Sequence, residues 1–383
     1  DKERKQTNHQ LRIQSDYLTA NISGDFQYQT LPATIQGFLH QYLPALVEKP
    51  KQQNKQPNNV GFYAYFRELE KITEALDMDV HFPSYPTVKG YINEEYNSLG
   101  LQAYIPKIRT STAQMEDLTI EMNNELDALD LSVYVFNRLP KKNPTAAKIG
   151  DVKAHMNLTA RENELDMTIS LDNTDSIRNA GEIQVGALLQ QYNNKPQANI
   201  HIQPTEIVLN DSIWTINESD IIYTVAEKKM DIRSFSINTD FQRIAANGIA
   251  STDPNDSIEV ELQNIDLQYL LGYTEASKAI SVQGPLSGWA KIYGLFAQPM
   301  IEANALLPNA GLNGTYLGDV TATAYLDREA KAIIINGEAI DSTNHKVVDV
   351  QGKVIPATKW WGLDIQCDSV DISLIDFWTN KIF

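Results

Sequence analysis

The densest group of metal-binding oxygen atoms in this sequence is the loop Asp253-Pro254-Asn255-Asp256-Ser257-Ile258-Glu259. Several carboxylate and carbonyl oxygens in one short loop are the ligands that a calcium ion requires. The loop has neither the central glycine nor the ligand order of an EF-hand, and Asp, Asn and Pro are also the ordinary residues of a hairpin tip. We therefore interpret the loop as a turn and predict no metal site.

The histidines do not form a catalytic group with any neighbouring nucleophile or acid. They are His9, His40, His81, His155, His201 and His345. No HExxH, GxSxG, P-loop or GxGxxG pattern accompanies them. Carboxylates are numerous, but no spacing singles out a pair for acid–base chemistry. The sequence therefore predicts no catalytic residue and no cofactor, and we expect that the protein is not an enzyme.

Two further features carry possible chemistry near the C-terminus. Cys367 is the only cysteine, so no disulfide can form within the chain. It falls on the apolar side of an alternating segment and is predicted to be a small core residue rather than a reactive thiol. The pair Trp360-Trp361, followed by Phe377-Trp378, has the flat rings that stack on sugars, but its apolar flanks favour edge or core positions.

The composition limits the classes of partner. The chain has 383 residues, 42% of them hydrophobic, and a net charge of −17. An acidic surface repels phosphate backbones, which argues against nucleic acid. No apolar run reaches the length of about 18 residues that a membrane-spanning helix needs. Because the chain starts at Asp1 without Met and stops at Phe383 just after an apolar stretch, we expect an excised piece of a longer protein.

The elements that position these residues are strands, because apolar and polar residues alternate over much of the sequence. Clear alternations lie at Val152–Leu158, Leu165–Asp172, Ile258–Gln263 and Leu363–Asp368. A period of two places all the apolar side chains of a strand on one face. Weak internal similarity between the stretches that begin at Gly248 and Gly352 indicates repeated units stacked on one another. The fold class predicted is mainly β, with antiparallel sheets that each have one apolar face.

Helices are predicted only near the N-terminus. Apolar residues spaced three and four apart predict a helix over 31–47 and a second over 62–77. The segment 49–59 between them has low complexity and is expected to be a disordered loop. We divide the chain into a strand and two-helix segment at 1–79 and two β-repeat regions at 80–245 and 246–383, which we expect to form one continuous elongated body.

Several segments resemble a known family. They are Ile213–Tyr223, Met230–Ile237, Gly248–Ser251, Ile258–Leu262, Gly311–Asp319 and Ile22–Phe26. Together they are similar to the periplasmic repeats of the AsmA-like superfamily, and most of all to the TamB-type translocation and assembly proteins of Gram-negative bacteria. The resemblance implies a long, curved sheet of the β-taco type, whose concave apolar face is a groove for phospholipid acyl chains between the inner and outer membranes.

The same resemblance implies a place and a partner. Members of the family are anchored in the inner membrane, extend into the periplasm and support outer-membrane protein assembly. A barrel of the BamA family is therefore an expected partner. The alternating segments supply candidates for the groove or for a closed core: Leu118, Ile120, Met167, Ile169, Ile258, Val260, Leu262, Leu363 and Ile365. Their neighbours on the other face are expected to be exposed: Asp166, Glu259, Glu261, Asp364 and Gln366.

The alternation by itself leaves a second class of protein open. A secreted or surface array of β-sandwiches that binds glycans or proteins would show the same pattern, with its apolar faces closed against each other. A one-sided sheet must cover its apolar face with another sheet, with helices or with an acyl ligand. The sequence does not choose among these coverings.

Overall fold

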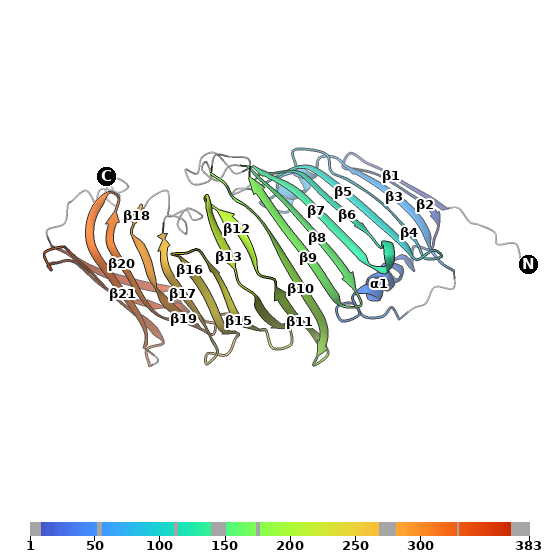
Figure 1. The fold of residues 1–383 in the computed structure, drawn as a ribbon. Helices are drawn as coiled ribbons and strands as arrows, with labels where there is room; N and C mark the ends of the chain where they lie inside the picture. The colour runs from blue at the N-terminus through green and yellow to red at the C-terminus, as the bar shows by residue number, and fades with distance from the viewer. Residues whose placement is uncertain are drawn as a thin grey trace, which may run out of the picture. The chain divides into compact units, whose positions relative to one another are not determined.

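A computed structural model of the chain describes residues 9–51, 56–110, 114–138, 151–173, 177–267, 281–327 and 329–368. Within these ranges it has 24 strands in an antiparallel sheet and two α-helices in the N-terminal third (Figure 1). The prediction of a mainly β chain with two helices near the N-terminus is confirmed. Phe377-Trp378 and residues 52–55 of the predicted loop lie outside the described residues.

The chain divides into two compact units, which we describe separately. Unit 1 comprises Asp1–Lys142, Ala147–Ile200 and Ile207–Asp211, and unit 2 comprises Asn143–Ala146, His201–Glu206 and Ser212–Phe383. The three segments predicted from the sequence, 1–79, 80–245 and 246–383, stay predictions.

In unit 1, the first ten strands pair antiparallel in chain order, from β1 with β2 to β9 with β10. These strands are β1 (His9–Gln14), β2 (Leu18–Asp25), β3 (Asn59–Phe66), β4 (Thr87–Asn93), β5 (Ser98–Arg109), β6 (Gln114–Asn123), β7 (Leu129–Arg138), β8 (Val152–Arg161), β9 (Glu164–Asn173) and β10 (Ala180–Tyr192). The strands β11 (Lys195–Ile202) and β12 (Thr205–Leu209) contribute residues to both units.

Unit 2 continues the same up-and-down order. Its strands are β13 (Ser212–Ile216), β14 (Ser219–Thr224), β15 (Lys229–Asn238), β16 (Arg243–Ala250), β17 (Ser257–Asp266), β18 (Val282–Gln283), β19 (Pro285–Tyr293), β20 (Met300–Leu312), β21 (Thr315–Asp327), β22 (Ala332–Ile340), β23 (Lys346–Ile355) and β24 (Trp360–Cys367). β13 and β14 both pair with β15, and the short β18 pairs with β20. The remaining strands from β15 to β24 pair in chain order.

Tight turns enforce this order. Asn193-Asn194, Asn210-Asp211 and Asn313-Gly314 each have positive φ at both residues. That conformation is the two-residue hairpin turn whose twist matches the twist of the flanking strands, and Asn, Asp and Gly adopt it most readily. Each turn therefore returns the chain beside the strand it has just left.

Helix α1 (Leu31–Tyr42) covers the end of the unit 1 sheet where several hairpins turn (Figure 1). Its buried Phe38 and Tyr42 pack with residues at the ends of the strands: Phe26, Val60, Ile92, Leu99, Leu129 and Ala160. The helix was predicted to run to residue 47. It ends at Tyr42 because Pro44 disfavours helical backbone at the residue before it.

A buried asparagine joins α1 to the sheet. Asn58 is 1% exposed and donates from Nδ2 to Thr34 Oγ1 at 2.7 Å. Its Oδ1 accepts from the Gln27 backbone N–H at 2.8 Å, and its own N–H donates to Glu94 Oε2. Because a buried amide must find partners for its donors and acceptor, this network sets the position of α1 against β3 and β4.

The second helix differs from its prediction. Residues Asn59–Phe66 form β3, and α2 spans only Leu69–Ala75. Val60, Phe62, Ala64 and Phe66 alternate on one face of β3, which pairs with β2 and β4. The helical spacing of Phe62, Phe66 and Leu69 was therefore coincidental, and the period of two decided the structure of this segment.

We expect Phe38→Ala to destabilise unit 1 by about 3–5 kcal/mol, because it removes a buried ring from the packing of α1 on the strand ends. Ile35→Ala on the exposed side of the same helix is the matched control and should change stability by no more than about 0.5 kcal/mol. Urea unfolding followed by circular dichroism measures both. Equal effects of the two substitutions would contradict the packing of α1 described here.

Candidate functional site

The candidate site is the apolar face of each unit. In unit 1, residues paired across neighbouring strands point to the same face. Two continuous apolar rows cross strands β1–β10 in this way. One is Leu11, Ile22, Phe62, Gly90, Leu101, Met122, Leu131, Leu158, Met167 and Val185. The other is Ile13, Ala20, Ala64, Val88, Ala103, Ile120, Val133, Met156, Ile169 and Ile183.

The face that bears these rows is not fully buried. Among the described residues, most side chains of the two rows are only half-buried, and Ile13 is exposed. Complete burial is concentrated at the strand ends that α1 covers. A closed core buries aliphatic side chains almost completely, whereas a face that touches only its own neighbours leaves part of each side chain accessible.

Unit 2 has the same arrangement with smaller side chains. Two rows cross the strands up to β24. One is Phe235, Ala246, Val260, Ala290, Ala303, Ala324, Ile335, Gly352 and Leu363. The other is Ile216, Ile237, Ile244, Leu262, Gly288, Ala305, Ala322, Gly337, Val350 and Ile365. Between β19 and β23 these two rows are mostly alanine and glycine, and we call this part the small-residue strip.

Larger side chains flank the strip on both sides. On one side, Ile258 pairs with Ile292, which pairs with Ile301. On the other side, Leu307 pairs with Val320, and Val348 lies two strands further along the same row. The apolar face of unit 2 is therefore lower along its middle than along its flanks.

The structure places all nine predicted residues on these faces. Ile120 and Ile169 share one row of unit 1, Met167 lies in the other, and Leu118 pairs with Ile105 beside a β-bulge. Val260 shares a row with Leu363, Leu262 shares one with Ile365, and Ile258 lies in the flanking isoleucine row. Their polar neighbours are exposed: Asp166, Glu259, Glu261, Asp364 and Gln366. Sequence reasoning missed the small-residue strip, because alanine and glycine give little hydrophobic signal.

The end of the described sheet overturns one prediction. Cys367 is exposed rather than a core residue. It lies on the apolar side of β24, as the alternation indicated, but β24 pairs only with β23 among the described strands. Leu363 and Ile365 on the same strand are 50% and 55% exposed for the same reason. An apolar position on a strand with one neighbour is not a buried position.

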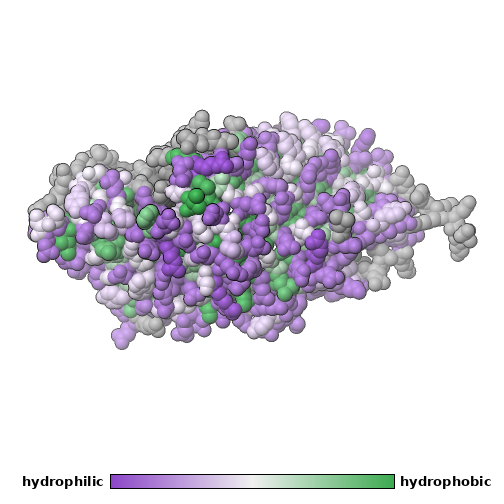
Figure 2. Space-filling model, viewed as in Figure 1, coloured by the Kyte–Doolittle hydropathy of each residue, from purple (hydrophilic) through white to green (hydrophobic). Residues whose placement is uncertain are grey.

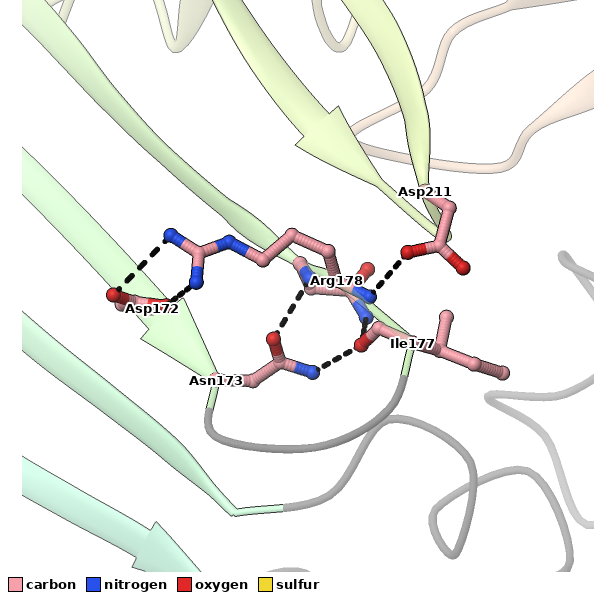
Figure 3. Close-up of polar contacts among 6 residues, drawn as sticks. Asp172, Asn173, Ile177, Arg178 and Asp211 are labelled. Carbon is pink, nitrogen blue, oxygen red and sulfur yellow. Dashed lines mark hydrogen bonds and ion pairs between the residues drawn. The ribbon is translucent and has the colours of Figure 1, made fainter.

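Polar side chains close the strand ends of unit 1 away from α1. Figure 3 shows that Asn173, the last residue of β9, bonds across the connection to β10: its Nδ2 donates to Ile177 O at 2.6 Å. Arg178 pairs with Asp172 at 3.3 Å, and its backbone N–H donates to Asp211 Oδ1 at 2.8 Å. These bonds satisfy backbone groups that would otherwise lose their partners where the strands end.

The opposite face of each sheet is polar. Figure 2 shows one side of the molecule, on which hydrophilic side chains predominate and apolar patches lie between them. Lys346 bonds Glu338 at 2.8 Å and Asp349 at 3.0 Å, and these carboxylates raise the pKa of its ammonium group. Tyr104 donates to Asp117 at 2.7 Å, which raises the pKa of the phenol. Such ordinary surface pairs stabilise a charged face without forming a reaction centre.

The histidines and the acidic loop, for which the sequence predicted no catalytic or metal-binding role, take part in local contacts. His155 Nε2 lies 3.0 Å from Ser132 Oγ, and His201 Nδ1 lies 2.9 Å from Asp220 Oδ1. In the acidic loop before β17, Asp253 Oδ1 accepts from the Asn255 backbone, as in an ordinary hairpin tip.

One cluster of possible metal ligands was not noticed in the sequence. Glu70, Glu74 and His81 bring possible ligand atoms within 4.8 Å of one another. His81 Nδ1 already lies 3.4 Å from Glu70 Oε1. The three side chains are partly exposed, so the cluster by itself does not indicate an ion.

Comparisons with known proteins give no family. No family model, no curated protein and no solved structure matches the chain. Within the described residues, neither helix has the length and hydropathy that a membrane crossing requires. The function must therefore be argued from the two apolar faces.

Thiol labelling tests the two faces. In the folded protein Cys367 should react readily with a maleimide, because its side chain is exposed. On a Cys367→Ser background, Glu259→Cys should be labelled at a similar rate. Ile258→Cys should be at least about tenfold slower, because Ile258 is 7% exposed. Equal labelling of the two introduced cysteines would contradict the register of β17.

Proposed function

We propose that the apolar faces of the two units bind the acyl chains of phospholipids. The observation that carries this proposal is the continuity of the apolar rows together with their half-buried state. Contiguous apolar surface left accessible in a soluble protein marks a binding site. A lipid chain that covers such a face gains about 0.8 kcal/mol for each methylene removed from water.

The small-residue strip supports the same proposal in unit 2. Alanine and glycine let a ligand approach the sheet closely, and the larger isoleucine, leucine and valine side chains on either side contact it laterally. A flexible acyl chain fits an open apolar strip because it needs shape and area rather than fixed hydrogen bonds. Since such binding needs no reacting side chain, the role that we propose is non-enzymatic.

The biological setting proposed rests on the family resemblance. We propose that the chain is a periplasmic segment of an inner-membrane-anchored, TamB-type protein. Its apolar faces would carry phospholipid between the inner and outer membranes, and a barrel of the BamA family would be its partner in outer-membrane assembly. The alternation of apolar and polar residues alone supports only the physical part of this proposal.

Native mass spectrometry of the purified full chain, with extraction of bound lipid, tests the proposal directly. Phospholipid that copurifies in proportion to the protein is the expected result. A chain that copurifies without lipid and binds no fluorescent phospholipid when titrated with it would reject the proposal. The secreted β-sandwich array, the competing proposal, predicts this second result, because its apolar faces would be closed.

Filling the small-residue strip should block binding in unit 2. Ala322 lies in one row with Ala305 and Gly337, so Ala322→Phe places a ring on the strip. We expect lipid binding by unit 2 to fall at least about fivefold while the melting temperature stays within a few degrees. Thr323→Phe, on the opposite face of the same strand, is the matched control and should bind lipid as the unchanged protein does. A fluorescent phospholipid titration measures both, and equal binding by the two variants would contradict the proposal.

A charge placed on the apolar face distinguishes an open face from a closed core. At Val260, which is half-buried, Val260→Asp places a carboxylate on the apolar face. If the face is open, water reaches the carboxylate, the fold survives and lipid binding falls. If the face is a closed core, the substitution should cost several kcal/mol out of a total stability of about 5–15 kcal/mol and unfold the chain. Thermal melts beside the lipid titration decide between these outcomes.

A further inference from the structure

The polar face of unit 1 has an open depression of about 550 Å³. Polar and aromatic side chains from β2 to β6 line it, among them Asn21, Tyr63, Lys89, Tyr91, Gln102 and Glu121. Asn21, Tyr63, Lys89, Gln102 and Glu121 form one cross-strand row. This row lies on the face opposite the one that carries the lipid proposal, and the residues between it and the next polar row, which belong to the apolar row of unit 1, also line the depression: Phe62, Gly90, Leu101 and Met122.

Glycines shape this depression. A Cβ on Gly100 would lie 2.4 Å from Tyr91 Cε1, so the ring of Tyr91 lies across Gly100. A Cβ on Gly61 would meet no atom within 4 Å, so the space above Gly61 is open. Tyr63 and Tyr91 are 45% and 47% exposed. Two accessible rings thus stand beside an open patch of sheet backbone.

Unit 2 has a second depression with the same side-chain chemistry, about 510 Å³ in volume. It lies over β21–β24, and its lining includes Tyr325, Asn336, Gln351, Lys353, Trp360 and Asp364. A Cβ on Gly362 would lie 3.0 Å from Trp360 Cη2, so this ring also lies over a glycine. The rings of Tyr325 and Trp360 are 49% and 51% exposed.

The two depressions share more than size. Each is lined by at least two aromatic residues and at least one asparagine, together with a glutamine, a lysine and a carboxylate. In unit 1, Gln102 pairs across strands with Glu121, and its Nε2 donates to Glu121 Oε1 at 2.6 Å. In unit 2, Gln351 pairs across strands with Asp364. The same set of groups therefore occurs in two separate parts of the chain.

We propose that each depression binds an oligosaccharide. Exposed tyrosine and tryptophan rings stack on the apolar C–H face of a pyranose ring, because one side of the ligand is apolar and its edge is polar. Amide and carboxylate groups beside the rings accept and donate hydrogen bonds to the sugar hydroxyls. A flat, open site suits an extended β-1,4-linked chain, which presents flat faces along its length.

The charges in the depressions favour a neutral sugar over an anionic polymer. Lys89 and Glu121 balance each other in unit 1, as do Lys353 and Asp364 in unit 2. The chain as a whole carries a net charge of −17, which repels nucleic acid and acidic polysaccharides. The exposed Trp360, whose sequence context favoured an edge or core position, has a binding role in this proposal.

Titration calorimetry of the full chain with N-acetylchitotetraose tests the proposal, with maltotetraose as a second sugar. The unchanged protein should bind N-acetylchitotetraose at two sites. Gly61→Val adds a side chain to the open patch, where a Cβ meets no atom within 4 Å, and should weaken the unit 1 site, whereas Trp360→Ala should weaken the unit 2 site. Each loss should be at least tenfold in affinity for that site.

Gly186→Val is the matched control for Gly61→Val. Gly186 pairs with Asp166 on the polar face, and a Cβ there also meets no atom within 4 Å, but it lines neither depression. This variant should keep both sites. Absence of binding for both sugars would overturn the proposal and show that the rings only cover glycines of the sheet. Unchanged binding by folded Gly61→Val and Trp360→Ala, confirmed by their melting curves, would overturn it as well.

Discussion

The rest of the structure depends on one constraint, which is that an antiparallel sheet with alternating side chains has two chemically different faces. In this chain, the cross-strand register aligns the apolar side chains of successive strands into continuous rows. Because the rows cross many strands, their apolar side chains form one continuous surface. That surface must be covered as a whole to be removed from water. In unit 1, α1 covers the strand ends and leaves most of the rows half-buried.

The two units meet this constraint with different side chains. Unit 1 places leucine and methionine in its first row, as at Leu101, Met122 and Met167. Unit 2 places alanine and glycine in the middle of its rows, as at Ala305 and Gly337. Long side chains fill space above a sheet and can adapt to a ligand, whereas small ones leave the space to the ligand. Under the proposal that both faces bind lipid, the small side chains of unit 2 would let an acyl chain lie closer to the backbone than in unit 1.

The polar faces of the two units carry aromatic rings beside amide and carboxylate groups. Aromatic rings that lie over glycines stabilise a sheet by covering backbone that has no side chain of its own. At Tyr91 and Trp360 the rings also remain accessible and stand beside amide and carboxylate groups. Because the lipid and sugar proposals concern opposite faces of the same strands, either can fail without the other.

Local pattern and long-range pairing determined different parts of this protein. The alternation in the sequence by itself determined the fold class and the face on which residues such as Met167, Ile258 and Leu363 lie, because a period of two is a property of a single strand. It did not determine β3, whose residues also fit a helix until β2 and β4 pair with it. Nor did it show that Asn58 is buried and joins α1 to the sheet. It also did not show that alanines and glycines line up across strands or that Cys367 is exposed. These features depend on which residues become neighbours across the sheet, and only the tertiary structure decides that.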